Sequence, residues 1–528
     1  MINRSTVKRI LEQLPCTVEL YWHLIQRHKL WQAHFNLDLL SEVLSEATQQ
    51  AEKARRQRKL GKKVFIFTSL HYWIEYAALM GVALAGRGHQ VTLSFLPYAS
   101  WDEPIEKFDL RRQNLYARDV LRAAGSLLQV QSLLDVKPFS RQLPLEIKQA
   151  VEQVSVFDTQ YGLQMEDITQ KEPLFQLRHE RNLDAALNAR AWLMAHRPDV
   201  VILPNGTIQE MGAVYQVARH LNLNTVTFEF SEQRERIWLA QDSEIMRNNT
   251  DELWAARGQE PLDEKQLNQL QDMYSARVDS KIWQNFTYQW QEIATQGGAA
   301  VKAALNLDDR PVILLAANVL GDSLTLGRQV FSQSMTEWVE RTLRFFIDRD
   351  DVQLIIRLHP DELMIKGTPF ATIIKSIMGE LPAHFHLVEP QAKINTYDIL
   401  EITQLGLVYS TTVGLEMAMR GLPVIIAGQT HYRGRGFTID PTSWEDYFAL
   451  LDEKLADLQS AQLTQDQVDL AWRYAYLFFF DFPKPFPWHL LDLKDDLRAR
   501  PMTYVLSAEG DQKYGPTFDA LTGTPLVW

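Results

Sequence analysis

The sequence has a single cysteine, Cys16, among 528 residues, and no apolar run that approaches the length of a membrane-spanning helix. One cysteine excludes an internal disulfide framework and is typical of a reducing compartment. A membrane-spanning helix needs roughly twenty consecutive apolar residues, so none is expected. The first residues, MINRSTVKRILEQLPC, also lack the apolar core of a secretory signal. We therefore expect a cytoplasmic protein.

Basic residues are outnumbered by acidic ones, since the sequence has 54 Lys and Arg against 66 Asp and Glu, and the formal net charge is −12. This balance argues against a general nucleic-acid binder. A local exception is the segment 52–63, EKARRQRKLGKK, in which seven residues are basic and one is acidic. A solvated helix end accounts for such a run, and contact with anionic lipid or an acidic glycan is the alternative. Peripheral association with the inner face of a membrane therefore stays open.

Several motifs of well-known chemistry are missing from the sequence. It has no Walker-type phosphate loop, no G-x-G-x-x-G after a strand, no serine nucleophile elbow and no zinc-ligand spacing. ATP hydrolysis, hydride transfer and zinc chemistry therefore lack support. We expect no metal and no tightly bound cofactor.

The sequence does contain two series of apolar strands that alternate with helical stretches. The first series runs through KKVFIFTSL, HQVTLSFLP, PDVVILPN and NTVTFEFSE, and the second through RPVILLAAN, DVQLIIRLHP, HFHLVEP, LGLVYS and LPVIIAG. Continuous apolar strands alternating with helices imply parallel sheets covered on both faces. A chain of this length exceeds one ordinary core. The pattern predicts an α/β protein with two facing, doubly wound, Rossmann-like domains.

The two series also predict where the domains begin and end. Apolar residues at helical spacing indicate a helical N-terminal extension. The tail, WRYAYLFFFDFPKPFPWHLL, suits core packing or a crossing back onto the first domain. The predicted divisions are an extension over 1–60, a first domain over 61–295, a second domain over 296–470 and a tail over 471–528.

The stretch YSTTVGLEMAMRGLPVIIAG places a hydroxyl cluster where a helix begins after a strand. Free N–H groups and the helix dipole at such a point attract phosphate. Gly414 permits close approach of a ligand, and Glu416, about one turn further along, can accept hydrogen bonds from ribose hydroxyls. The alternative is an ordinary capped helix that ends at a glycine-proline stop. The hydroxyl cluster comprises Ser410, Thr411 and Thr412.

Two further polar segments follow strands of the second series. RLHP ends one strand and contributes Arg357, His359 and Pro360. A histidine there can contact a base or phosphate, and a structural hydrogen bond is the alternative. The loop GQTHYRGRGFTID follows the last strand, and its cations can neutralise a leaving phosphate in place of a metal. Its candidate residues are His431, Tyr432, Arg433 and Arg435.

Strand ends in the first series carry candidates for acceptor binding and for a general base. The turn Asn205-Gly206-Thr207 can bind a substrate through its backbone N–H groups. His71 and Asp158 are weaker candidates for a role in acceptor binding or as the base. A carboxylate is needed to deprotonate an acceptor hydroxyl. The candidates for this base are Glu210, Glu229 and Glu232.

Several of these segments resemble known families. LAGRGHQVTL and GLEMAMRGLPVIIAG resemble passages of glycosyltransferases with two facing Rossmann-like domains, the GT-B fold. Together with RLHP and HYRGRGFTID, they resemble the bacterial capsule polysaccharide biosynthesis family, which includes transferases that use CMP-activated acidic sugars. The resemblance covers residues 310–445 well and 60–240 weakly.

The resemblance implies a metal-independent glycosyltransferase that builds a surface polysaccharide. The second domain would bind a CMP- or UDP-linked sugar, and the first domain a glycan or glycolipid acceptor. Glu416 would hold the donor ribose, and the nucleotide contacts would come from His359, Pro360, Ser410, Thr411 and Thr412.

The sequence departs from the family in lacking an acidic-acidic-glycine motif for the catalytic base, for which Glu229 and Glu232 are the substitutes. Two alternatives stay open. A nucleotide-sugar 2-epimerase would need no acceptor, and a non-catalytic subunit of polysaccharide biosynthesis or export would bind without turnover.

Overall fold

A computed structural model describes residues 8, 11, 14, 16–26, 35–284, 286, 293–364 and 367–528. The chain divides into two compact units. The first unit comprises Met1–Asp158, Thr169–Met246 and Lys484–Val527. The second comprises Thr159–Ile168, Arg247–Pro483 and Trp528. Each unit is α/β and Rossmann-like, so the predicted fold class is confirmed.

The sheet of the first unit has the strand order β12-β6-β5-β4-β1-β2-β3. Strands β1 to β5 are parallel, and β6 and β12 are antiparallel additions at one edge. The order reverses between β1 and β4, which is the topological switch point where such sheets bind ligands. The strands are β1 Lys63–Ser69, β2 Gln90–Leu96, β3 Leu128–Ser132, β4 Val200–Pro204, β5 Thr225–Phe230, β6 Arg236–Gln241 and β12 Lys484–Pro485.

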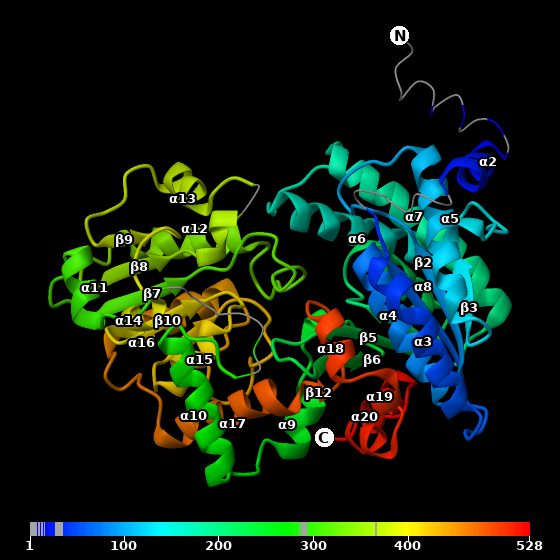
Figure 1. Cartoon of the computed structure of the whole chain (residues 1–528). Helices are drawn as coiled ribbons and strands as arrows, with labels where there is room; N and C mark the ends of the chain where they lie inside the picture. The colour runs from blue at the N-terminus through cyan, green and yellow to red at the C-terminus, as the bar shows by residue number, and fades with distance from the viewer. Residues whose placement is uncertain are drawn as a thin grey trace. The chain divides into compact units, whose positions relative to one another are not determined.

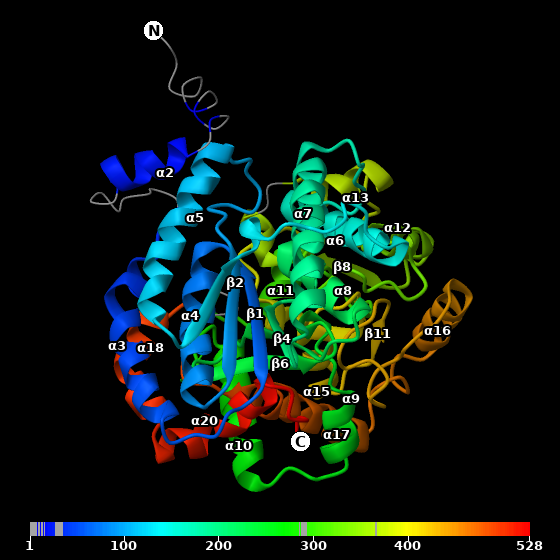
Figure 2. The same ribbon diagram turned by 90° about the vertical axis from the view of Figure 1, so that its right-hand side faces the viewer.

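Helices cover both faces of this sheet, with α3 and α4 on one side and α7 and α8 on the other (Figure 2). Every residue of β4 is buried, as is every residue of β1 after Lys63, which explains the apolar runs VVILP in β4 and VFIF in β1. The helices wholly or mainly in this unit are α2 Thr17–Tyr21, η1 Trp22–Gln26, α3 Asp38–Arg55, α4 His71–Gly86, α5 Lys107–Leu121, η2 Arg122–Ala124, η3 Leu133–Asp135, α6 Leu145–Leu163, α7 Pro173–His196, α8 Gln209–His220, η4 Ile245–Arg247, α18 Leu493–Ala499, α19 Met502–Val505 and α20 Ala508–Leu521.

The sheet of the second unit repeats this topology (Figure 1). Its order is β11-β10-β7-β8-β9, all parallel, and its switch point lies between β7 and β10. The strands are β7 Val312–Ala316, β8 Gln353–Arg357, β9 Phe385–Val388, β10 Thr403–Val408 and β11 Val424–Ile426. The helices are α9 Asp251–Arg257, α10 Glu264–Val278, α11 Gly298–Leu305, α12 Met335–Phe346, η5 Pro360–Met364, α13 Phe370–Met378, α14 Thr396–Leu400, α15 Val413–Met419, α16 Trp444–Ala456, α17 Gln465–Tyr476 and η6 Leu477–Asp481.

The two units divide the chain differently from the predicted domains. Residues 247–295 were expected in the first domain but belong to the second unit. The reason is α10, whose Arg277 pairs with Glu416 and whose Tyr274 accepts a hydrogen bond from Arg420. The tail is also divided, because β12 pairs with β6 and carries the chain back into the first unit. Part of the expected extension over 1–60 lies outside the described residues, and its described part contains the helices α2, η1 and α3.

Within the described ranges, no helix is both long enough and apolar enough to cross a bilayer.

Candidate functional site

A hydrogen bond joins the two strand ends that flank the switch point of the second unit. Asn318 follows β7 and Ser410 follows β10, and the Ser410 N–H donates to Asn318 Oδ1 at 3.2 Å. The Ser410 hydroxyl donates to the Leu324 carbonyl at 3.4 Å. These bonds join the carboxyl ends of β7 and β10, the side of a Rossmann-like sheet on which nucleotides bind. Asn318 is not among the residues predicted from sequence, although it ends the apolar segment RPVILLAAN and so follows a predicted strand directly.

Two backbone donors stand next to this bond. Thr411 and Thr412 are partly exposed, and α15 begins directly after them. Within the residues that the structure describes, neither of their backbone N–H groups forms a hydrogen bond. The Thr412 side chain makes no capping bond either. These two N–H groups are therefore open to an anionic ligand among the described residues, and their contact with a nucleotide stays a prediction.

Gly414 and Tyr432 support the hydroxyl cluster from behind. The Tyr432 side chain is buried, and its hydroxyl donates to the Thr411 carbonyl at 2.5 Å. A Cβ atom at Gly414 would lie 2.3 Å from that hydroxyl oxygen. The glycine is thus required by the packing of Tyr432. The packing between Gly414 and Tyr432 accounts for both residues without a ligand. The approach of a ligand to them stays a prediction.

Glu416 already has partners inside the protein. Its side chain is 1% exposed, and its carboxylate lies 3.1 Å from the Arg277 guanidinium. The Tyr397 hydroxyl also donates to the carboxylate at 3.1 Å. Burial and the neighbouring Glu416 charge raise the pKa of Tyr397 well above its usual value, so this hydroxyl stays protonated. The ribose contact of Glu416 stays a prediction, and it would require this buried carboxylate to become accessible.

The RLHP segment places one residue toward solvent and one inside. Arg357 is buried, and its guanidinium donates to the carbonyls of Glu389 at 3.1 Å and Ile394 at 3.4 Å. Burial lowers the pKa of Arg357 to about 10, so it remains charged at neutral pH. It holds the loop after β9, and its predicted nucleotide contact would require it to leave these carbonyls.

His359 is the exposed member of this segment, with a side chain that is 37% accessible. Its Nδ1 accepts a hydrogen bond from the Asp361 N–H at 3.2 Å, which puts the ring proton on Nε2. Burial of the ring lowers the pKa of His359, while Asp361 and Asp322 oppose the shift. The neutral ring can therefore donate from Nε2 at pH 7. Pro360 starts η5 directly behind it.

The loop after β11 is anchored by its own polar side chains. His431 Nδ1 lies 2.9 Å from the Tyr474 hydroxyl, and its ring stacks on Phe478 with 3.8 Å between centroids. Burial lowers the pKa of His431 well below its usual value, so the ring is neutral. Arg433 donates to the Ile426 carbonyl at 2.7 Å, and Arg435 pairs with Asp251 at 2.5 Å. Both predicted cations are thus engaged within the second unit.

The switch point of the first unit holds a closed network of charges. The Ser69 hydroxyl, at the end of β1, donates to Glu210 in the first turn of α8 at 2.8 Å. Arg178 pairs with Glu210 and with Asp158, each at 2.9 Å. All three charged side chains are at most 1% exposed. Glu210 and Asp158 therefore hold the fold together, and neither is open to an acceptor.

The turn at Asn205 differs from the expectation about its backbone. The N–H of Asn205 donates to the Phe228 carbonyl at 2.8 Å, that of Gly206 to the Pro204 carbonyl at 2.7 Å, and that of Thr207 to Asn205 Oδ1 at 3.0 Å. Gly206 has φ +84°, and a Cβ there would lie 2.6 Å from Thr227 Cγ2. The three N–H groups that were expected to bind the acceptor are used within the first unit.

Glu229 lies beside this turn, near the carboxyl end of β5. Asn205 Nδ2 donates to Glu229 Oε2 at 3.3 Å. Burial raises the pKa of Glu229 to about 7, although the hydrogen bonds from Asn205 and from the Phe230 N–H oppose the rise. The side chain stays partly exposed. A carboxylate that titrates near pH 7 suits general base catalysis.

The remaining candidates of the first unit lie at neighbouring strand ends. His71 begins α4 after β1, with its ring edge toward Phe35, and burial lowers its pKa. Glu232 lies in the turn between β5 and β6 and is partly exposed. Of the three glutamate candidates, Glu229 is therefore the one whose environment favours a base. The sequence alone does not distinguish it from the other two.

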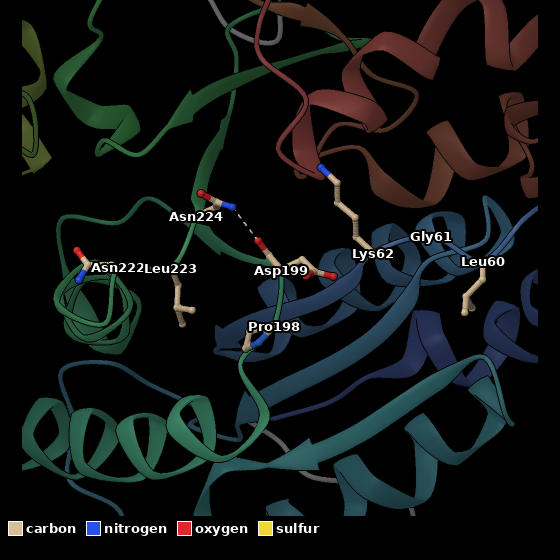
Figure 3. Close-up of a pocket in the computed structure, with 8 residues that line it drawn as sticks. All are labelled: Leu60, Gly61, Lys62, Pro198, Asp199, Asn222, Leu223 and Asn224. Atoms are coloured by element: carbon tan, nitrogen blue, oxygen red, sulfur yellow. Dashed lines mark hydrogen bonds between the residues drawn. The ribbon is translucent and has the colours of Figure 1, made fainter.

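A hollow of about 660 Å³ lies at the opposite edge of this sheet (Figure 3). Lys62, Asp199 and Asn224 line it and immediately precede β1, β4 and β5. Asn224 Nδ2 donates to the Asp199 carbonyl at 3.1 Å. The hollow is at the amino ends of the strands, away from Ser69 and Glu229 at their carboxyl ends.

Comparison with known proteins gave only distant similarities. No protein-family model matches the chain, and no curated protein matches its sequence. The chain is similar to the KpsC β-Kdo 2,4 transferase of Thermosulfurimonas dismutans, with 16% identity over 57% of this chain and 87% of that one and a TM-score of 0.35. It is also similar to the calicheamicin glycosyltransferase CalG4, with 15% identity over 85% and 100% of the chains and a TM-score of 0.26.

A third solved structure is the putative UDP-N-acetylglucosamine 2-epimerase of Listeria monocytogenes. It has 14% identity over 78% of this chain and 91% of that one, with a TM-score of 0.26. Similarities at these scores carry no argument about activity, so the function has to be argued from the residues of this chain.

Proposed function

We propose that the protein is a glycosyltransferase that transfers a sugar from a CMP- or UDP-linked donor to the glycan or glycolipid acceptor of a surface polysaccharide. The observation that supports this most is Glu229, a carboxylate that titrates near pH 7 at a strand end of one Rossmann-like unit. The other unit offers, at its own strand ends, two N–H groups without a partner among the described residues, and a neutral histidine. A base in one unit and an anion site in the other match the division of labour in a two-domain transferase.

The proposal assigns the donor nucleotide to the crevice between β7 and β10. A phosphate there would accept hydrogen bonds from the N–H groups of Thr411 and Thr412, and from the Ser410 hydroxyl once that hydroxyl turns away from the Leu324 carbonyl. His359 would donate from Nε2 to the phosphate or the base. Asn318 would hold Ser410 in place through the bond that joins the two strands.

In the proposed reaction, Glu229 takes the proton of an acceptor hydroxyl. The acceptor oxygen forms a bond to the anomeric carbon, the bond from that carbon to the donor phosphate breaks, and the nucleotide leaves. Cations and N–H groups can stabilise the departing phosphate, so the proposal needs no metal.

Either Arg433 or Arg435 would have to leave its present partners to act as the cation. Arg435 pairs with Asp251, its own side chain is 12% exposed, and it also donates to the Thr250 hydroxyl at 3.2 Å. Arg433 is held by the carbonyls of Ile426 and Pro441.

The test is to measure nucleotide release from CMP- and UDP-sugars with and without glycan acceptors. Release that requires an acceptor, and that is lost in Glu229→Gln and in Ser410→Ala with His359→Ala, supports the proposal. An epimer formed from a UDP-sugar alone would identify an epimerase instead. Binding of nucleotide without turnover would identify a non-catalytic subunit.

A further inference from the structure

The basic segment, residues 52–63, forms an exposed edge of the first unit. It comprises the last turn of α3 and the connection into β1 (Figure 1). Its side chains at 53, 56, 58, 59, 62 and 63 are exposed, and all six are Lys or Arg. On a chain with a net charge of −12, this concentration of positive charge is local.

Only some of these cations have partners inside the protein. Arg58 lies 3.3 Å from Asp511, and Lys62 Nζ donates to the Thr522 carbonyl at 2.7 Å. Among the described residues, the side chains of Lys53, Arg56 and Lys59 form no ion pair or hydrogen bond. These three cations are therefore available to an external anion.

An exposed leucine lies among the cations. Leu60 is 75% exposed, follows Lys59 in the chain, and lines the same hollow as Lys62 (Figure 3). An apolar side chain flanked by cations matches the boundary between phosphate headgroups and acyl chains of a bilayer. A soluble polyanion would use the charges and leave Leu60 in water. The segment also lacks an aromatic side chain on which a sugar ring would stack.

We propose that the basic segment docks the protein on a bilayer surface that contains anionic phospholipid. The negative charge of the rest of the chain is repelled by such a surface, so the segment also sets the orientation of the first unit. The segment leads into the amino end of β1, whereas Ser69 and Glu229 lie at carboxyl ends of strands. Docking through the segment therefore leaves the carboxyl ends of the strands accessible. The inference does not depend on the proposed function.

The experiment is cosedimentation of the full chain with vesicles of phosphatidylcholine alone, or with a quarter of phosphatidylglycerol or phosphatidylserine, at 0.1 M salt. We expect binding to both anionic mixtures, at least tenfold weaker binding to pure phosphatidylcholine, and loss of binding at 0.5 M salt. The double variant Arg56→Glu with Lys59→Glu should bind at least tenfold more weakly. Leu60→Ala should weaken binding several-fold with the same salt dependence.

The matched control is Lys148→Glu with Lys171→Glu, which makes the same change in net charge at exposed helix and turn positions of the first unit. It should bind anionic vesicles within about twofold of the unaltered chain. An equal loss in both double variants would overturn the proposal, because net charge alone would then govern binding. Tight binding to dextran sulfate without binding to vesicles would also overturn it in favour of a soluble polyanion. Unchanged thermal unfolding shows that each variant is folded.

Discussion

The side-chain amide of Asn205 donates a hydrogen bond to the Glu229 carboxylate, with 3.3 Å between Nδ2 and Oε2. The bond joins the strand ends of β4 and β5 in the first unit. Asn205 reaches it from a left-handed backbone conformation, with φ +59°, and its own carbonyl oxygen Oδ1 accepts from the Thr207 N–H. The amide is thus oriented by the turn, and it holds the carboxylate at the edge where acceptors are expected.

Replacing Glu229 by Gln should abolish the base while keeping the shape of the side chain. We expect the rate of acceptor-dependent nucleotide release to fall by about 10² to 10⁴. In the unaltered protein, the rate should rise with pH through about 7, because only the ionised carboxylate accepts a proton. Initial rates between pH 5 and 9 test both points. Glu232→Gln is the control, and a loss of similar size in that variant would transfer the role of base to Glu232.

The same substitution should change the dependence of stability on pH. The pKa of Glu229 is raised in the folded state, so folding favours the protonated form. The stability that protonated Glu229 contributes is fully present below the unfolded pKa near 4.5, and it is lost as pH rises through the folded pKa of about 7. Glu229→Gln should therefore be more stable than the unaltered protein by about 1–3 kcal/mol above pH 7, with no such gain at pH 4.5. Urea unfolding at the two pH values measures the difference, and equal differences at both would contradict the raised pKa.

Replacing Arg178 by Met should strongly destabilise the first unit. The guanidinium is fully buried between Asp158 and Glu210, and its loss leaves two buried carboxylates without their cation. Removing one partner of a buried ion pair costs about 3–5 kcal/mol. Arg122→Met is the control, because that arginine is 70% exposed and pairs with Asp119 on the surface. Its loss should cost less than about 1 kcal/mol. Chemical unfolding of both variants tests the contrast.

The strands were predictable from sequence because burial leaves a direct trace in it. Strands β7 and β11 are buried along their whole length, and their sequences are unbroken apolar runs. The hydroxyl cluster was predictable for a related reason, since Ser410 follows such a run directly. Local pattern and local structure coincide in these segments.

Contacts between distant segments left no such trace. The partner of Glu416 is Arg277 on α10, and nothing in either segment indicates the other. For the same reason, the sequence assigned residues 247–295 to the wrong compact unit. Asn318 gains its position only when β7 and β10 become neighbours. Three glutamates looked alike as bases, and they differ only in burial and in partners that come from elsewhere in the fold.

Glu416 has two possible roles, the predicted contact with the donor ribose and a structural ion pair with Arg277. Titration with nucleotides that have or lack the 2′-hydroxyl distinguishes them. A ribose ligand distinguishes CMP from 2′-deoxy-CMP, whereas a buried structural carboxylate does not. From its burial, we expect Glu416→Gln to destabilise the protein by about 3 kcal/mol, because Arg277 keeps a buried charge without its partner. The ratio of the two dissociation constants should change by less than about twofold. Calorimetric titration with each nucleotide, or with UMP and 2′-deoxy-UMP if these bind better, measures the ratio below the unfolding temperature. Glu453→Gln, an exposed carboxylate of the second unit, is the control and should alter neither quantity. A tenfold fall in the preference for the ribonucleotide, at any cost in stability, would show that Glu416 binds the ribose.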